Sequence, residues 1–165
     1  MDDGTETRID KLYRIIGESR YGIHDLSRTE LDATNKLPRF NMPLELGLFL
    51  GAKKYGGDEH KLKRCLILDI EQFRYQKFIS DIAGIDITEH NGEPKRIVVS
   101  VRQWLLTVSG RKTIPTLQTL VKSHDAFIEG LPAIAIAAGL EPSAISYPDY
   151  ERLVIAWVKA EIAPA

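Results

Sequence analysis

A continuous apolar run, Arg64–Asp69 (RCLILD), constrains the fold more than any other part of this chain. A strand-length run without polar alternation is typical of strands covered on both faces, as in parallel α/β sheets. Residues 21–26 predict a second strand, and residues 86–90 a short extended segment. Only the first two strands are convincing. The sequence therefore predicts an α/β fold with a small parallel sheet.

Apolar residues at helical spacing predict helices around these strands. An amphipathic helix is expected at residues 8–17. A helix from Pro43 to about Tyr55 is apolar on nearly every side, which predicts a buried helix. Further helices are expected at residues 73–82 and 95–108, although the β-branched residues at the start of the second segment leave a strand as the alternative there.

The pattern from Ile114 onward is entirely helical. We expect one helix from Pro115 to about Gly130, a short apolar helix at residues 131–139, and a last helix that begins at Tyr147. No linker is long enough to separate two domains. The prediction is therefore a single domain of 165 residues, with a sheet-containing part at 1–110 and a helical part at 111–165.

Composition excludes several classes of protein. The net charge of -1 gives no support for a nucleic-acid-binding surface, which would usually show a basic excess. No apolar run approaches the roughly 20 residues of a membrane span, and the acidic N-terminus is no signal peptide. The one cysteine, Cys65, lies in an apolar run and is predicted to be a buried, inert thiol. We therefore expect a cytoplasmic protein that binds neither nucleic acid nor membrane.

Three carboxylates are the strongest candidates for chemistry. Asp25 and Asp69 each end a predicted strand, and Glu45 lies in the first turn of the apolar helix. Ligands of open parallel sheets bind at the carboxyl ends of the strands, so the three are predicted to converge on one edge. For each residue alone, capping, a turn or the helix dipole is a sufficient explanation. The three together favour a site.

Other polar residues near this edge have either a structural or a ligand-binding explanation. Arg39 and Arg28 could pair with a carboxylate or hold a phosphate. Asn41 is most simply the N-cap of the apolar helix. Asp81 belongs to a polar segment that either closes over a pocket or is a solvated connection. His24 precedes Asp25 in the strand and points to the opposite face, so a packed histidine is favoured over a catalytic one.

Several signatures are missing from the sequence. It has no GxGxxG after a strand, no P-loop, no CxxC and no HExxH. Dehydrogenase-type dinucleotide binding, P-loop phosphoryl transfer and a structural zinc are therefore unsupported. No metal and no resident cofactor is predicted.

Three segments resemble the central part of the TIR-like and nucleoside 2-deoxyribosyltransferase-like proteins. They are IHDLSRTE, LPRFNMPLELGLFLGAKKYG and KRCLILD. The matching positions are Asp25-Leu26-Ser27, Arg39, Asn41 and Glu45-Leu46-Gly47. Over about residues 8–160 the chain is also similar to a bacterial subgroup of that superfamily.

The resemblance implies a flavodoxin-like fold and a catalytic helix glutamate. In that superfamily the glutamate attacks or stabilises the anomeric carbon of a ribosyl group. The resemblance assigns this role to Glu45. Asp25 would orient ribose hydroxyls or Glu45 itself. The expected substrate-binding residues are Arg39, Asn41, Arg28, Ser27, Asp69 and Asp81. A nucleoside, a nucleotide or NAD would be the substrate, and NAD would be cleaved rather than used for hydride transfer.

In that superfamily a strand and a helix precede the helix at residues 8–17, and this sequence lacks them. The resemblance therefore predicts an exposed sheet edge. Such an edge favours self-association, or a partner that supplies the missing strand. One interpretation is that the chain is an enzyme: an N-glycosidase, an NADase or a deoxyribosyltransferase. Two alternatives stay open. These are a non-enzymatic signalling or assembly module and a structural remnant without activity.

Overall fold

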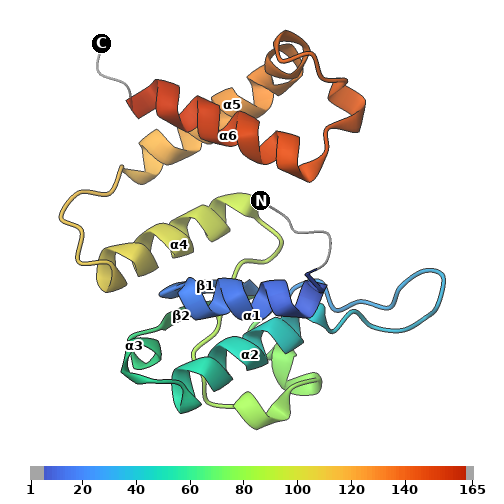
Figure 1. The fold of residues 1–165 in the computed structure, drawn as a ribbon, viewed down its shortest axis with the longest axis vertical. Coiled ribbons are helices and arrows are strands. Elements are labelled where there is room, and N and C mark those ends of the chain that lie inside the picture. The colour runs from blue at the N-terminus through green and yellow to red at the C-terminus, as the bar shows by residue number, and fades with distance from the viewer. Residues whose placement is uncertain (1–5, 163–165) are drawn as a thin grey trace. The chain divides into compact units, whose positions relative to one another are not determined.

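The computed structural model describes residues 6–162 (Figure 1). The chain divides into two compact units, residues 1–112 and residues 113–165. The first unit carries the sheet. In chain order its elements are α1 (Arg8–Glu18), β1 (Tyr21–Asp25), α2 (Asn41–Tyr55), α3 (Asp58–Lys61), β2 (Arg64–Asp69), the 3-10 turns η1 (Arg74–Lys77) and η2 (Ser80–Ile82), β3 (Thr88–Glu89) and α4 (Pro94–Val108).

The sheet has three parallel strands in the order β1-β2-β3. Tyr21 is in register with Arg64, and Leu68 with Thr88. The central strand β2 is buried from Leu66 to its end, as expected for a continuous apolar run covered on both faces. The small parallel α/β fold is confirmed, and β3 adds a third strand to the two that are convincing in the sequence.

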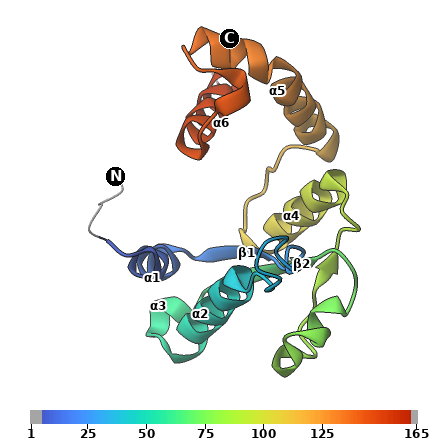
Figure 2. The same ribbon diagram turned by 90° about the vertical axis from the view of Figure 1, so that its right-hand side faces the viewer.

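Helices α2 and α4 cover opposite faces of the sheet (Figure 2). Tyr21 packs edge-on against Trp104 of α4, with ring centroids 5.8 Å apart. His24 packs edge-on against Phe49 of α2, at 5.2 Å. Successive side chains of a strand point to opposite faces. Odd-numbered side chains of β1 therefore face α4, and even-numbered side chains face α2.

Gly22 lies where β1 and α2 approach closely. A Cβ added there would lie 2.8 Å from Cε2 of Phe49 and 2.9 Å from Nε2 of His24. Both rings are packed, so we expect Gly22→Ala to lower the free energy of unfolding by about 1–3 kcal/mol. Chemical denaturation would measure it. Gly47→Ala on the open side of α2, where a Cβ meets nothing within 4 Å, is the control and should be neutral or stabilising.

Strand β1 is an edge strand within the described part of the chain. The Arg20 carbonyl accepts from the Arg64 amide at 2.9 Å, and the Leu26 amide donates to the Leu68 carbonyl at 2.8 Å. Since a parallel ladder uses alternate residues, the even-numbered backbone groups face β2. The backbone groups of Tyr21, Ile23 and Asp25 therefore point away from the sheet.

The prediction of one helix at residues 73–82 is wrong. The chain forms two short 3-10 turns there, and Phe73 enters the first with a φ of 62°. Phe78, Ile79 and Ile82 pack separately against a buried cluster that contains Tyr75. These tertiary contacts, rather than a regular helical face, account for the apolar spacing.

The expectation that α2 is buried on nearly every side is also wrong. Only Leu46 and Phe49 of this helix are buried, whereas Leu44 is 53% exposed. The helix contacts α1, α3 and β1, and these contacts leave part of its apolar surface exposed. Asn41 is the first residue of α2 and not its cap, because Phe40 occupies the N-cap position and no side chain caps the helix there.

The second unit consists of α5 (Leu117–Ala137), the 3-10 turn η3 (Pro142–Ala144) and α6 (Tyr147–Ile162). Phe127, Ala135 and Leu153 form its buried core. The two helices expected at residues 115–130 and 131–139 are one helix, with Pro132 inside it. Packing of both halves on the same core explains why the proline does not end the helix. No helix within residues 6–162 combines the length and apolar character needed to cross a membrane.

Candidate functional site

The sequence predicted Glu45 in the first turn of the helix, but α2 begins at Asn41, so Glu45 is its fifth residue and lies at the start of the second turn, half-buried. Burial raises the pKa of its carboxyl group, and the positive charge of Arg8 opposes that shift only in part. No hydrogen bond or ion pair to Glu45 is present among the described residues. A partly desolvated carboxylate without a partner is costly, which is typical of a group kept for function.

Glu45 lines two adjoining hollows between α1 and α2. One, of about 180 Å³, is lined by Arg8, Ile9, Leu12, Asn41, Leu44 and Glu45. We call it the Arg8 hollow. The other, of about 170 Å³, lies between α1, the outer edge of β1 and α2, and we call it the His24 hollow. Leu12 and Glu45 line both, so the carboxylate lies where the two meet.

His24 lines the second hollow and is only 7% exposed. Its Nε2 atom is buried and has no hydrogen-bond partner. Burial lowers the pKa of the imidazole, which favours the neutral ring. The hollow thus contains two titratable side chains, Glu45 and His24, that lack partners in a wall that is otherwise mostly apolar.

Asp25 and His90 form a separate pair at the carboxyl ends of the strands. Oδ1 of Asp25 accepts a hydrogen bond from the Ser27 amide at 2.9 Å and lies 3.3 Å from Nε2 of His90. Nδ1 of His90 accepts from the Gly92 amide at 3.1 Å. That bond assigns the ring proton to Nε2, which donates to Asp25. The pair ties the end of β1 to the loop that follows β3.

Asp69 is fully buried at the end of β2 and is held by Arg74. Its Oδ1 accepts from Nε and Nη2 of Arg74 at 2.9 and 2.7 Å, and from the Ile70 amide at 2.8 Å. Arg74 also donates to the Leu26 carbonyl at 2.7 Å and to Thr29 Oγ1 at 3.0 Å. These bonds fasten the loop after β1 to β2, which is a structural role. Oδ2 of Asp69 is buried without a partner.

The structure thus divides the residues predicted for one site. Glu45 and Asn41 line the Arg8 hollow, whereas Asp25, Ser27 and Asp69 belong to the bonded cluster at the strand ends. The remaining three, Arg28, Arg39 and Asp81, are exposed.

Sequence reasoning missed Arg8 and Arg74, placed His90 only in a segment rich in potential ligands, and gave His24 a packing role. No local motif marks these contacts: His90 meets Asp25 across 65 positions, and Arg74 meets Asp69 because the chain turns back after β2. No group of three or more His, Cys, Asp or Glu side chains within residues 6–162 is placed to hold a metal ion.

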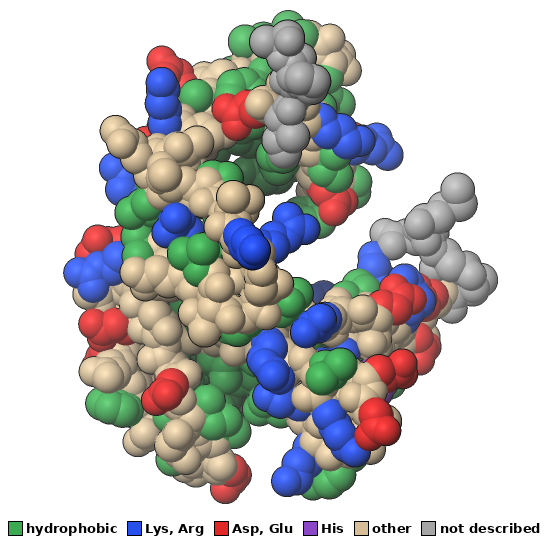
Figure 3. Space-filling model, turned by 90° about the vertical axis from the view of Figure 1, so that its left-hand side faces the viewer, with side chains coloured by type: hydrophobic (Ala, Val, Ile, Leu, Met, Phe, Trp, Pro, Cys, Tyr) green, Lys and Arg blue, Asp and Glu red, His purple; other side chains and the backbone are tan. Residues whose placement is uncertain are grey.

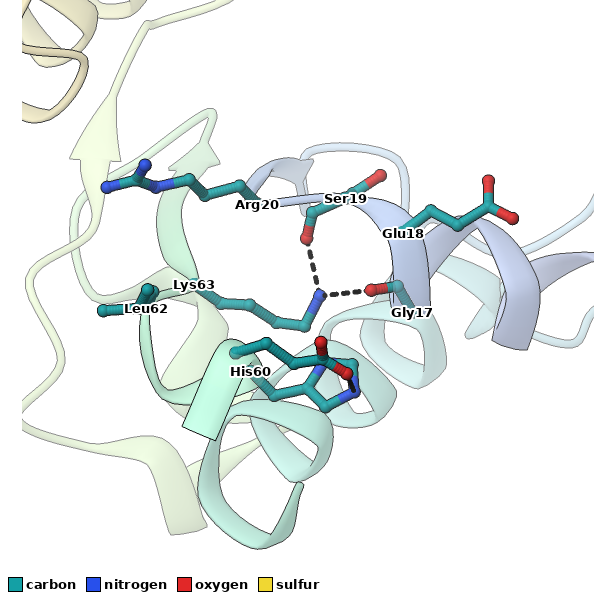
Figure 4. Close-up of a pocket in the computed structure, with 8 residues that line it drawn as sticks. Gly17, Glu18, Ser19, Arg20, His60, Leu62 and Lys63 are labelled. Atoms are coloured by element: carbon teal, nitrogen blue, oxygen red, sulfur yellow. Dashed lines mark hydrogen bonds and ion pairs between the residues drawn. The ribbon is translucent and has the colours of Figure 1, made fainter. Parts of the chain in front are cut away.

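A further hollow, of about 520 Å³, lies at the C-terminal end of α1 (Figure 4). Lys63 is only 2% exposed there. Its Nζ donates to the carbonyls of Ile16, of Gly17 at 3.2 Å and of Ser19 at 2.6 Å. The ammonium group therefore caps the end of α1, and we assign it a structural role.

On the face shown in Figure 3, Lys and Arg side chains are mixed with Asp and Glu side chains.

No protein-family model, curated protein or solved structure matches this chain. The resemblance described above therefore stays a prediction. The geometry around Glu45 is the feature that points to a function.

Proposed function

We propose that this chain binds a nucleoside or nucleotide beside α2 and cleaves its N-glycosidic bond with the help of Glu45. The observation that carries the proposal is the half-buried, unpartnered carboxylate where two hollows meet. Each hollow is smaller than the roughly 300–1,000 Å³ of a typical small-molecule site, and the two together reach the lower end of that range. A ligand of two linked parts would fill both, with its linking bond at Glu45.

The chemistry follows from the position of the charge. As the C1′–N bond breaks, its electron pair leaves with the base, and the sugar becomes an oxocarbenium-like centre. A carboxylate that is poorly solvated gains most from this positive charge. Glu45 would stabilise the centre or form a bond to C1′. Water or another base would then take the sugar and give up a proton. A nucleobase leaves as an anion and takes up that proton, whereas the nicotinamide of NAD leaves neutral and the proton passes to solvent.

The Arg8 hollow suits the sugar side of such a ligand. Asn41 offers amide donors and an acceptor for ribose hydroxyls, and Arg8 offers a cation for phosphate. Arg39 lies in the loop that leads into α2, where it could contact a longer phosphate chain. Asp25, held by Ser27 and His90, is left outside this proposal.

The test is release of free base by the wild type and by Glu45→Gln. Both proteins would be incubated with NAD and a panel of nucleosides and nucleotides, and the products separated by chromatography. We expect the glutamine variant to lose at least about a hundredfold in rate, because the charge that stabilises the transition state is gone. No base release from any substrate by folded wild-type protein would refute cleavage.

The same pair of proteins provides a stability control. The pKa of Glu45 is raised on folding, so the folded state binds this proton more tightly than the unfolded chain. Stability therefore falls as pH rises through that window. Glu45→Gln should be as stable as the wild type or more stable at neutral pH. The difference should vanish below the ordinary pKa of glutamate, and a large loss of stability would instead give Glu45 a structural role.

The open edge of β1 favours a second candidate function, assembly with another chain. The outward backbone groups of Tyr21, Ile23 and Asp25 are available to a further strand, and Ile23 is 49% exposed. Exposed edges recruit strands from other chains. Under this proposal the protein acts by association and needs no chemistry at Glu45.

A further inference from the structure

We infer that the His24 hollow is the subsite for the base of the ligand, and that His24 Nε2 recognises one flat heteroaromatic ring system there. The inference rests on the proposed function for the nature of the ligand as a nucleoside or nucleotide. It adds which hollow takes the base and which side chain selects it.

Size and lining favour a ring over a sugar or a phosphate. At about 170 Å³ the hollow is too small for a whole nucleotide. Its walls are largely apolar and include an aromatic side chain, Phe49; the apolar contacts come from Leu12, Ile15, Ile16, Ile23 and Phe49. Apolar walls suit the faces of a heteroaromatic ring and do not solvate a phosphate. The described residues that line the His24 hollow also include no Lys or Arg to bind a phosphate, whereas the Arg8 hollow has Arg8.

The polar groups of the hollow suit the edge of such a ring. His24 Nε2 is buried without a partner, and most buried polar atoms in folded proteins have one. A neutral imidazole nitrogen donates or accepts according to its tautomer. A nucleobase or a nicotinamide offers both ring acceptors and N–H donors. Nε2 is fully buried in this structure, so the imidazole must turn toward the hollow before a bound base gives His24 the hydrogen bond that it lacks.

The arrangement also places the reacting bond. Glu45 lines both hollows, so a base beside His24 and a sugar in the Arg8 hollow would bring the glycosidic bond to its carboxylate. With the base beside Arg8 instead, the sugar would lie against apolar walls. Its hydroxyls would then have few partners besides Glu45 and His24.

The experiment uses free bases, so that binding is measured apart from cleavage. Nicotinamide, adenine and uracil would each be titrated into the full chain and followed by calorimetry. In parallel, ¹⁵N NMR of the imidazole nitrogens would report each histidine. We expect at least one base to shift the Nε2 signal of His24 and leave His124 unchanged, since His124 is exposed on α5. The base that binds would show whether the ligand is a nicotinamide, purine or pyrimidine nucleoside or nucleotide.

The variant His24→Phe keeps a ring and removes Nε2. It should bind the same base at least about fivefold more weakly, as expected for one lost hydrogen bond. His124→Phe is the matched control and should bind like the wild type. Equal binding by His24→Phe and wild type, or no base that perturbs His24, would overturn the inference. The wild-type NMR shift decides the question even if His24→Phe does not fold.

The base subsite and the cleavage reaction can be refuted independently of each other. Base binding that depends on His24, without cleavage of any nucleoside, would support the subsite and refute catalysis. Cleavage that depends on Glu45, with base affinity unchanged in His24→Phe, would refute the subsite and support the proposed function.

Discussion

Arg74→Ala is expected to destabilise the sheet-containing unit by about 3–5 kcal/mol, the range for a buried ion pair that loses one partner. Asp69 is fully buried, and Arg74 supplies two of the three hydrogen bonds to its Oδ1. Without the guanidinium, a buried carboxylate is left with one amide donor. The same substitution removes the donors to Leu26 and Thr29, which frees the loop between β1 and α2.

Chemical denaturation of three variants would check this prediction. In Arg74→Ala/Asp69→Asn the unpaired charge is gone, so part of the lost stability should return. Arg96→Ala is the matched control, because Arg96 pairs with Glu93 in an exposed i,i+3 contact at 3.2 Å. It should cost at most about 1 kcal/mol. An equally small loss in Arg74→Ala would contradict the structural role assigned to Arg74.

Lys63→Met is expected to cost about 2–4 kcal/mol, because hydrogen bonds from a charged donor are worth more than neutral ones. Methionine fills a similar volume but donates no hydrogen bond. The carbonyls of Ile16, Gly17 and Ser19 would then lose their shared donor at the end of α1. The contact between Lys63 Nζ and the Phe49 ring, at 5.4 Å, would be lost as well.

Thermal and chemical denaturation would measure this effect against Lys61→Met. Lys61 lies two residues away, is exposed, and pairs only with Asp58 in an i,i+3 contact at 2.7 Å. Its replacement should change stability by about 0.5 kcal/mol or less. Similar losses in both variants would mean that the three carbonyls do not depend on Lys63.

Local patterns in the sequence were sufficient for most of the secondary structure. The run Arg64–Asp69 predicted β2 with the bounds that the structure has, since a continuous apolar run of this length is typical of a buried strand. The amphipathic spacing after Thr7 predicted α1, and the Thr7 side chain indeed caps that helix. Cys65 was expected to be buried and is only partly so, and desolvation raises the pKa of its thiol to about 11.

The same patterns failed where distant contacts decide the conformation. Phe78, Ile79 and Ile82 are spaced like a helix, but they lie on or next to two short 3-10 turns and pack on the cluster around Tyr75. The apolar surface of α2 suggested burial on all sides, yet the contacts with α1, α3 and β1 leave part of that surface exposed. Apolar character indicates that a side chain gains from burial. It does not say whether the rest of the chain provides the cover.

Local patterns were enough to predict the parallel α/β class and the strand-end positions of Asp25 and Asp69, and they placed Glu45 on α2 one turn too early. Which of these carboxylates have partners depends on contacts between distant elements. Asp25 meets His90 across 65 positions of the chain, and Asp69 meets Arg74 only because η1 turns back on β2. Glu45 meets neither, and lies with His24 between α1 and α2. Periodicity records which face a residue takes on its own element, whereas hydrogen bonds and hollows depend on how the elements pack together.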